Sequence, residues 1–393
     1  MRIGISTSVI QRGQTGIAQY IFALVRAFLT HSGEHEFVLF TLKDDLELFD
    51  FAKGKMRIVA VSERFRPPIR NIFWHQTVLP RLLREQQIEV LHVPSYRRLL
   101  WSGPCPLVGT IHDLAPFHLG NKYDWARMFY GRVIARRLAQ RQDEIIAISH
   151  NTARDIARFF GVDRARISVI YNGLEHNRFF PGSREQAQAE IAQRYKLQAP
   201  FFLYVSRLEH PAKNHIRLIS AFNHFKSKTQ SDWMLVLGGS DWHGADVIRA
   251  AVRQSPFERD VRLLGFVADA DLPNLYRAAE VFVYPSLYEG FGMPPVEAMA
   301  CGCPVICSNR GSLGEVVDDA AVILNPENVD SMADQLLLLA NNADVREQLR
   351  AAGLKRARRF DWNRTAIDTL SVYSRVGQSP ENFSALSRQK IRH

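Results

Sequence analysis

The stretch from Tyr284 to Asn309 reads YPSLYEGFGMPPVEAMACGCPVICSN, and the rest of the chain is best understood from it. Just before it, residues 281–284 (VFVY) form a short apolar run that is typical of a buried parallel strand. The glycine-containing turn and the prolines predict a loop and then a helix that starts near Pro294 and ends at Gly302. The apolar residues 304–307 predict the next strand. The stretch therefore indicates one strand–loop–helix–strand repeat of a parallel α/β sheet.

Two glutamates in this stretch, Glu289 and Glu297, are separated by seven residues. The loop brings a helix N-terminus, with free N–H groups and partial positive charge, to the carboxyl edge of the sheet, where it can bind a phosphate. An acid beside a phosphate is better suited to hydroxyl groups, such as those of a ribose and a sugar. The alternative is that Glu297, in the first helical turn, only complements the helix dipole and that Glu289 is a solvated loop residue.

The Glu-x7-Glu spacing within EGFGMPPVEAMACGCPV resembles the signature of the retaining glycosyltransferases of family 4, and the resemblance extends over nearly the whole chain. It implies the GT-B architecture, in which two Rossmann-like domains enclose a cleft. It also implies roles in binding a nucleotide-diphosphate sugar. Glu297 would hold the ribose, and Glu289 together with the backbone of Phe291 and Gly292 would hold the donor sugar.

Length and composition agree with two globular domains, because 393 residues with 46% apolar and 23% charged side chains exceed one ordinary core. Strands alternate with helices in both halves, which predicts an α/β fold of two doubly wound domains with the site in the cleft between them. We place an acceptor-binding domain at 1–190, a nucleotide-sugar-binding domain at 196–375 and a disordered tail at 376–393.

No window approaches the roughly 18 apolar residues of a membrane span, and the start lacks the features of a signal peptide, so we expect a cytoplasmic protein. Four cysteines predict packing in a reducing compartment rather than disulfides or a zinc site: Cys105, Cys301, Cys303 and Cys307. The net charge of +10 is concentrated in residues 1–195, which favours an anionic partner or membrane surface. No nucleic-acid-binding motif is present, so we expect no nucleic acid partner.

Residues 123–141 predict a helix rich in arginine and aromatic residues. Such a helix can lie on an anionic bilayer, which would make the protein peripheral on the inner face of the cell membrane. The alternative is a solvated basic face over a buried stripe of Val133, Ile134 and Leu138.

Two positions in the first half are candidates for the donor site. A predicted strand at 2–9 leads to a loop containing Gly16; the loop is not G-x-G-x-x-G, so it is either an ordinary turn or, as the resemblance implies, a backbone contact to the leaving phosphate or sugar. His112 follows a predicted strand at 107–111 and either faces the ligand crevice or is hydrogen-bonded in the core. The resemblance places His112 against the donor sugar, where Asp113 orients it or caps the next segment.

The second half supplies the cations. Arg207 follows a predicted strand at 201–205, and Lys213 starts the next helix, so a planar fork and a point charge can converge on a diphosphate. The resemblance gives both residues this role. It also places Gly265 and Phe266 near the nucleoside base.

Residues Asp269 and Asp271 spell D-x-D, a metal-nucleotide motif of a different glycosyltransferase fold. Here they immediately precede a predicted helix, so we interpret them as helix-capping residues. We therefore expect neither a metal ion nor another cofactor.

The activity implied by the resemblance is retaining transfer of a hexose from a nucleotide-diphosphate sugar to a saccharide or lipid-linked saccharide acceptor. The segment 112–117 is similar to mannosyltransferases of polysaccharide assembly, which favours GDP-mannose, followed by UDP-glucose or another UDP-hexose. One alternative is a non-catalytic nucleotide-sugar-binding scaffold on the same fold. The other is a sugar phosphorylase using pyridoxal phosphate, for which no lysine context is apparent.

Overall fold

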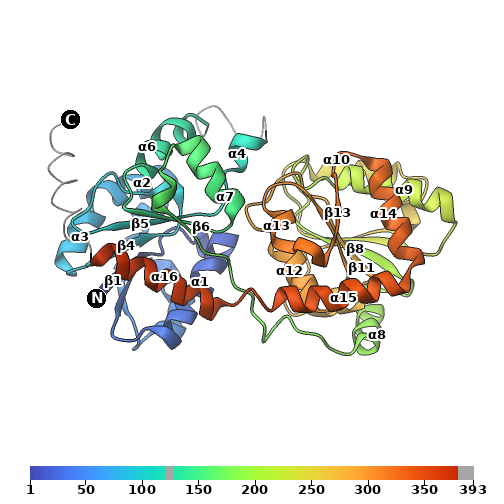
Figure 1. The fold of residues 1–393 in the computed structure, drawn as a ribbon, viewed down its shortest axis with the longest axis horizontal. Coiled ribbons are helices and arrows are strands. Elements are labelled where there is room, and N and C mark those ends of the chain that lie inside the picture. The colour runs from blue at the N-terminus through green and yellow to red at the C-terminus, as the bar shows by residue number, and fades with distance from the viewer. Residues whose placement is uncertain (120–127, 379–393) are drawn as a thin grey trace. The chain divides into compact units, whose positions relative to one another are not determined.

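The computed structural model describes residues 1–119 and 128–378, and they form two compact units (Figure 1). Of the described residues, 1–119, 128–173 and 362–378 form unit 1, and 174–361 form unit 2. The division differs from our prediction, which put the boundary at 190–196 and the last helix in the second domain. That helix, α16 (Trp362–Gly377), belongs to unit 1 because Thr365 Oγ1 donates to the Tyr171 carbonyl at 2.8 Å and Tyr373 packs against the ring of Phe28.

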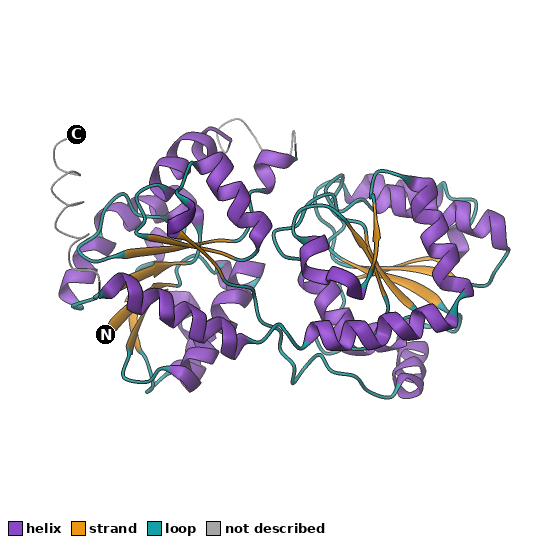
Figure 2. Ribbon diagram, in the orientation of Figure 1, coloured by secondary structure: helices purple, strands orange, loops and turns teal. Residues whose placement is uncertain are grey.

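Unit 1 contains a seven-stranded parallel sheet in the order β3-β2-β1-β4-β5-β6-β7. Its strands are β1 (Arg2–Ser6), β2 (Glu36–Leu42), β3 (Arg57–Val61), β4 (Val90–Val93), β5 (Leu107–Ile111), β6 (Glu144–Ala147) and β7 (Ile167–Val169). The α-helices are α1 (Gly16–His31), α2 (Pro68–Thr77), α3 (Leu79–Glu85), α4 (Ala115–His118), α6 (Arg136–Ala139), α7 (His150–Asp155) and α16. Helices lie on both faces of the sheet (Figure 2), as expected for strands that read as continuous apolar runs.

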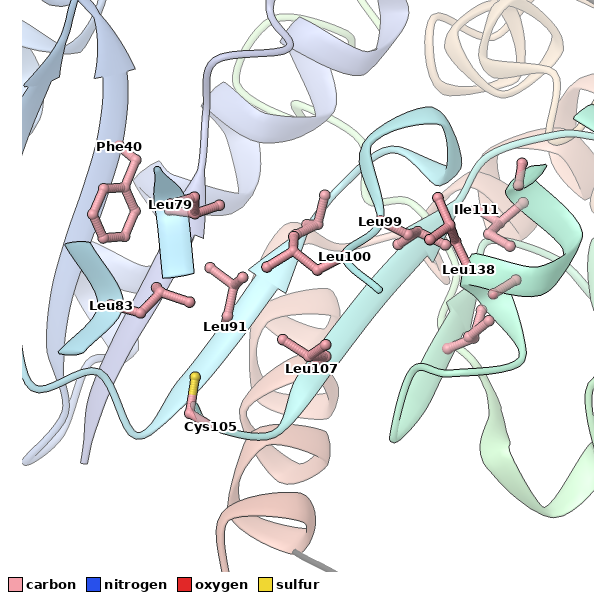
Figure 3. Close-up of a cluster of buried hydrophobic side chains, with 14 of the residues drawn as sticks. Phe40, Leu79, Leu83, Leu91, Leu99, Leu100, Cys105, Leu107, Ile111 and Leu138 are labelled. Atoms are coloured by element: carbon pink, nitrogen blue, oxygen red, sulfur yellow. The ribbon is translucent and has the colours of Figure 1, made fainter. Parts of the chain in front are cut away.

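The core of unit 1 is divided by the sheet into two clusters of buried apolar side chains. Figure 3 shows one of them, in which Leu83 of α3 lies near Leu91 of β4, and Leu138 of α6 lies near Leu99 and Ile111. These side chains are at most 3% exposed, so this face of the sheet is buried.

Unit 2 contains a six-stranded parallel sheet in the order β10-β9-β8-β11-β12-β13. Its strands are β8 (Phe201–Val205), β9 (Met234–Gly238), β10 (Val261–Gly265), β11 (Val281–Tyr284), β12 (Val305–Ser308) and β13 (Val322–Leu324). Its α-helices are α8 (Arg184–Tyr195), α9 (His215–Thr229), α10 (Ala245–Arg253), α11 (Leu272–Ala278), α12 (Met293–Ala300), α13 (Leu313–Val317), α14 (Val329–Asn341) and α15 (Ala343–Ala357). Both units are thus doubly wound, which confirms the predicted α/β class.

The central prediction is confirmed in detail, because β11, α12 and β12 follow one another where the sequence placed them. Gly302 ends the helix with a φ of +78°, a conformation that favours glycine. Cys301, Cys303 and Cys307 are buried free thiols, as predicted for packing residues. Strand β13 was not predicted, because its three residues at the sheet edge are too few to give a periodic pattern.

Two predictions fall partly on residues that the structure does not describe. Residues 376 and 377 of the predicted disordered tail (376–393) belong to α16 instead. The tail beyond residue 378 and the first part of the 123–141 helix lie outside the described residues. From residue 128 onward the helix is present, but residues 130–135 have π-helical hydrogen bonding. This change of period moves Ile134 out of the predicted buried stripe, and its side chain is 37% exposed. None of the helices within the described ranges is long and apolar enough to cross a bilayer.

Candidate active site

The loops that follow β8 and β11 meet at the carboxyl edge of the unit 2 sheet. These two strands are neighbours although they are far apart in sequence, so the chain reverses its winding direction between them. Ligands of open α/β sheets bind at such a switch point. Three contacts join the loops: Lys213 Nζ to Glu289 Oε1 at 2.6 Å, Leu287 N to the Ala212 carbonyl at 3.0 Å, and Asn214 Nδ2 to the Pro285 carbonyl at 3.1 Å. Two predicted site residues, Lys213 and Glu289, are therefore in direct contact.

The Glu289 carboxylate is held from several directions. Its Oε1 accepts hydrogen bonds from both Lys213 and the Tyr284 hydroxyl, the latter at 3.0 Å. The backbone carbonyl of Glu289 accepts from Ser312 N at 3.0 Å and from Ser312 Oγ at 3.1 Å. In the described part of the chain Oε2 has no hydrogen-bond partner, so it can accept from a ligand hydroxyl.

The N-terminus of α12 lies directly after this loop. Gly292 is its N-cap with a φ of +90°, and no side chain caps it. Pro294 and Pro295 have no N–H, so the free donors at this end are the N–H groups of Gly292 and Met293, for which no described residue is an acceptor. Partially positive donors that face a ligand loop suit a phosphate. The Phe291 side chain is buried against the ring of Phe360, so only its backbone can serve a ligand.

Glu297 lies in the second turn of α12, not in the first as predicted, so complementing the helix dipole does not explain it. Its Oε2 accepts a hydrogen bond from the Tyr276 hydroxyl at 2.9 Å. Burial raises the pKa of Glu297 to about 7, although the Tyr276 hydrogen bond lowers it. The Glu297 carboxylate is thus largely removed from water, and Tyr276 is its one hydrogen-bond donor among the described residues. Hydroxyl donors from a ligand would stabilise its ionised form.

This pKa predicts a pH-dependent stability. Because the folded state holds the Glu297 proton more tightly than the unfolded chain does, stability falls as pH rises from about 4.5 to about 7. Glu297→Gln removes that loss. We expect the two proteins to be equally stable at pH 4.5 and the variant to be more stable by roughly 2 kcal/mol at pH 8, a value discounted for partial solvent exposure. Urea unfolding at both pH values measures it; a difference that does not change with pH would contradict the assignment.

Arg207 is not brought into contact with Lys213. Its Nη2 lies 3.3 Å from Glu209 Oε2, and its guanidinium lies over the ring of Trp242, 4.5 Å from the centroid. The Arg207 side chain is 52% exposed, so it is free to reorient. The predicted convergence of the two cations on a diphosphate therefore remains a prediction that requires a ligand.

The end of β10 presents a glycine and an exposed aromatic ring. Gly265 has a φ of +68°, and its carbonyl accepts from Gly239 N at 2.7 Å, which ties it to the end of β9. Phe266 is 74% exposed, which is unusual for so large an apolar side chain. An exposed ring at the ligand edge of the sheet fits the predicted contact with a base.

In unit 1, His112 follows β5 at the carboxyl edge of its sheet. Its Nε2 donates to the Pro94 carbonyl at 3.2 Å, and its ring meets Tyr20 edge-on at 4.7 Å. Burial lowers the pKa of His112 to about 4, so the ring is neutral near pH 7 and Nδ1 can only accept a hydrogen bond. Of the two predicted roles of Asp113, capping is the one observed, because its Oδ1 accepts from Ala115 N at 3.0 Å.

Gly16 is the first residue of α1, which Thr15 caps by accepting from Ala18 N at 3.2 Å. A side chain at Gly16 would meet no atom within 4 Å, and its φ is not positive. The fold itself therefore gives no reason for a glycine there. The predicted role of Gly16, a backbone contact to a ligand, stays a prediction.

The D-x-D segment departs from the prediction in its contacts. Asp271 is at the N-cap of α11, but its carboxylate does not cap the helix; it accepts from Arg194 at 2.5 Å and from Tyr195 at 2.7 Å. Asp269 is 3.4 Å from Arg178. The two carboxylates thus form separate ion pairs, Asp271 with Arg194 and Asp269 with Arg178. These ion pairs, and not helix capping, explain the two aspartates.

Sequence reasoning missed several residues that position the site. Tyr276 holds Glu297, Tyr284 and Ser312 hold Glu289, and Trp242 lies under Arg207. Only Tyr284 gave a signal, since it is a polar residue at a strand end. The others come from separate elements, and nothing in their local sequence indicates which carboxylate or cation they contact.

The fold and this arrangement define a class of protein. Solved structures of the GT-B type cover nearly the whole chain: HepE of Anabaena in complex with UDP and glucose (TM-score 0.73, 18% identity, 95% of this chain and 99% of that one) and the galactosyltransferase WaaB (TM-score 0.68, 17% identity, 95% and 100%). At these identities they show the shared fold. The chain is of the GT-B class.

Sequence comparison then gives the family. The family model "Glycosyltransferase Family 4" matches residues 14–178, and "Glycosyl transferases group 1" matches residues 187–356. O-antigen chain mannosyltransferase B of Escherichia coli is 30% identical over 393 residues, which cover 95% of this chain and 99% of that protein. The mannosyltransferase WbdA of the same organism is 29% identical over 73% of this chain, but the match covers 36% of WbdA. The chain belongs to the family 4 glycosyltransferases; it is a hexosyltransferase close to mannosyltransferases of polysaccharide assembly.

Proposed function

We propose that this enzyme transfers mannose from GDP-mannose, with retention of configuration, to a saccharide or lipid-linked saccharide. The observation that carries the proposal is the junction of Lys213 and Glu289 beside the free N-terminus of α12, since it combines phosphate donors with a hydroxyl acceptor. Two mannosyltransferases among the relatives favour the mannosyl donor. A UDP-hexose donor is the second candidate, supported by the fold shared with a UDP-bound protein.

In the proposed reaction, the acceptor oxygen forms a bond to the anomeric carbon while the bond from that carbon to the diphosphate oxygen breaks. The negative charge that develops on the diphosphate is stabilised by Arg207, Lys213 and the N–H groups at the start of α12. All of these groups belong to the protein chain. The acceptor proton ends on the departing phosphate oxygen. Attack from the same face as the leaving group gives retention, and it requires no covalent nucleophile.

The remaining predicted residues bind and orient the donor. Glu297 accepts from the ribose hydroxyls, and Phe266 with Gly265 flanks the base. Within unit 2, Glu289 Oε2 accepts from a hydroxyl of the donor sugar. In unit 1, His112 Nδ1, which can only accept a hydrogen bond near neutral pH, and the backbone N–H groups around Gly16 are proposed as further ligand contacts.

We assign acceptor binding to unit 1, and we propose that this unit also contacts an anionic membrane surface at the inner face of the cell membrane. Two of its helical segments support this by carrying exposed apolar side chains next to arginines. Ile69 and Phe73, which are 82% and 61% exposed, flank Arg70 on α2. Phe129 and Ile134 lie near exposed arginines of 128–139.

The function can be tested without knowing the acceptor, because water can replace it. We expect the enzyme to hydrolyse GDP-α-mannose slowly, with α-mannose as the first sugar released, as seen by NMR before mutarotation. The reaction should proceed in the presence of EDTA. If β-mannose is the first sugar released, the proposed retention of configuration is wrong. If only UDP-hexoses are hydrolysed, the donor is a UDP-hexose and not GDP-mannose. Nucleotide binding without hydrolysis or transfer would favour the scaffold alternative.

A further inference from the structure

The carboxyl edge of the unit 1 sheet has its own switch point, between β1 and β4. From β1 the chain builds outward to β2 and β3 and then crosses to the other side as β4. The residues gathered there come from three elements: Ser6 ends β1, Asn71 and His75 lie on α2, and Arg98 ends the 3₁₀ turn η4 (Tyr96–Arg98) that follows β4. The proposed function leaves this group without a role.

Arg98 is a half-buried cation without a carboxylate partner among the described residues. Its Nε donates to Asn71 Oδ1 at 2.6 Å and its Nη1 to the Arg97 carbonyl at 3.0 Å, while Nη2 has no partner in the described part of the chain. Burial lowers the pKa of Arg98, with the Arg97 charge adding to the effect. A charge taken partly out of water normally has an anion beside it, because desolvation otherwise destabilises it.

Asn71 is a second, independent indication. Its side chain is 2% exposed, and no described residue supplies an acceptor for its Nδ2. The amide cannot be turned around, because Oδ1 must face the Arg98 N–H. His75 does not supply the missing acceptor: its Nδ1 donates to the Asn71 carbonyl at 2.8 Å, so its Nε2 accepts from Ser6 Oγ at 2.9 Å. An unsatisfied donor thus lies beside an unpaired guanidinium, and both lack the same chemical partner, an oxyanion.

We propose that Arg98, supported by Asn71, binds a phosphate group carried by the acceptor. The inference rests on the assignment of the acceptor to unit 1, and it adds the chemical class of that acceptor: a phosphate ester. The switch point of this sheet is where a ligand of unit 1 is expected. Arginine in this position offers the planar fork that a phosphate recognises.

The test follows the Arg98 Nε–H signal by NMR in full-length protein labelled with ¹⁵N-arginine, with the signal assigned from Arg98→Gln. We expect n-butyl phosphate to shift this signal saturably in the wild type. Isothermal titration calorimetry measures the affinity in wild type and variant alike, and Arg98→Gln should weaken the binding of n-butyl phosphate about ten-fold or more, the usual effect of a lost charge-assisted hydrogen bond. Arg166→Gln is the matched control, because Arg166 is also half-buried and its Nη1 bonds only to backbone carbonyls.

The outcomes separate the possibilities. A signal that does not respond to n-butyl phosphate overturns the proposal, and this arm needs no variant that could misfold. If the Arg98 signal responds to inorganic phosphate but not to n-butyl phosphate, the claim that the acceptor carries the phosphate is overturned. If it responds to glucuronate alone, the claim that the bound anion is a phosphate is overturned. GDP-induced stabilisation of unit 2 should be unchanged in Arg98→Gln, so a failed donor site would be recognised separately.

Discussion

Lys213→Met should lower the turnover number roughly a hundred- to a thousand-fold, the range observed when one preorganised charge stabiliser is removed from an active site. The Lys213 ammonium forms an ion pair with Glu289, the residue proposed to bind the donor sugar, and both side chains are only 16% exposed. The same change leaves the Glu289 charge without its partner, so the free energy of unfolding should also fall by roughly 1–3 kcal/mol. Steady-state kinetics and urea unfolding measure the two effects.

Two further variants separate catalysis from stability. Lys228→Met removes a lysine of the same unit whose partner Asp334 is largely exposed, and it should change stability by less than about 1 kcal/mol and leave activity intact. In Lys213→Met with Glu289→Gln, the stability lost in the single variant should largely return while activity stays low. Recovery of activity in the double variant would show that Lys213 acts only by neutralising Glu289.

Gly311→Ala should reduce both stability and activity strongly. Gly311 has a φ of +63°, and a Cβ there would lie 2.4 Å from the carbonyl oxygen and 2.9 Å from the nitrogen of Glu289. Neither backbone atom can yield without moving the loop that carries the carboxylate. We expect a loss of roughly 2–4 kcal/mol and at least a hundred-fold drop in turnover, since a displacement of about 1 Å has that effect on a positioned group.

Gly314→Ala is the matched control three residues away. A Cβ at Gly314 would meet no atom within 4 Å, and the residue lies inside α13 with an ordinary φ. This change should be neutral or slightly stabilising, because alanine favours a helix. Equal losses in both variants would mean that the region tolerates no substitution. The close approach of residue 311 to the Glu289 backbone would then not be the cause of the loss.

Much of the fold could be predicted because its information is local. Runs such as 201–205 and 281–284 are apolar and short, and glycines and prolines mark where each loop turns. The assignment of α16 could not be predicted in this way. Its residues pack on unit 1 through Thr365 and Tyr373, and such a return across the chain depends on tertiary contacts.

The site was predictable as a set of residues, and its contacts were not. The Glu-x7-Glu spacing and the strand-end positions indicated Lys213, Glu289 and Glu297. The partners that determine how those groups behave are distant in sequence: Tyr276 is 21 residues from Glu297, and Lys213 is 76 from Glu289. The proposed phosphate site at Arg98 could not be predicted from the sequence. Its evidence is that Arg98 and Asn71 lack partners among the described residues, which only the folded structure shows.

The most direct test of the central claim, a nucleotide-sugar site in unit 2, is a thermal-shift panel of GDP, UDP, ADP and TDP with their sugars, with and without divalent metal. We predict that one nucleoside diphosphate series, GDP first, stabilises the protein in EDTA. At about 100 times the dissociation constant the gain should be roughly 2.7 kcal/mol. Arg207→Ala and Glu297→Ala should abolish it. If no nucleotide shifts the melting temperature under any metal condition, the donor-site assignment is contradicted.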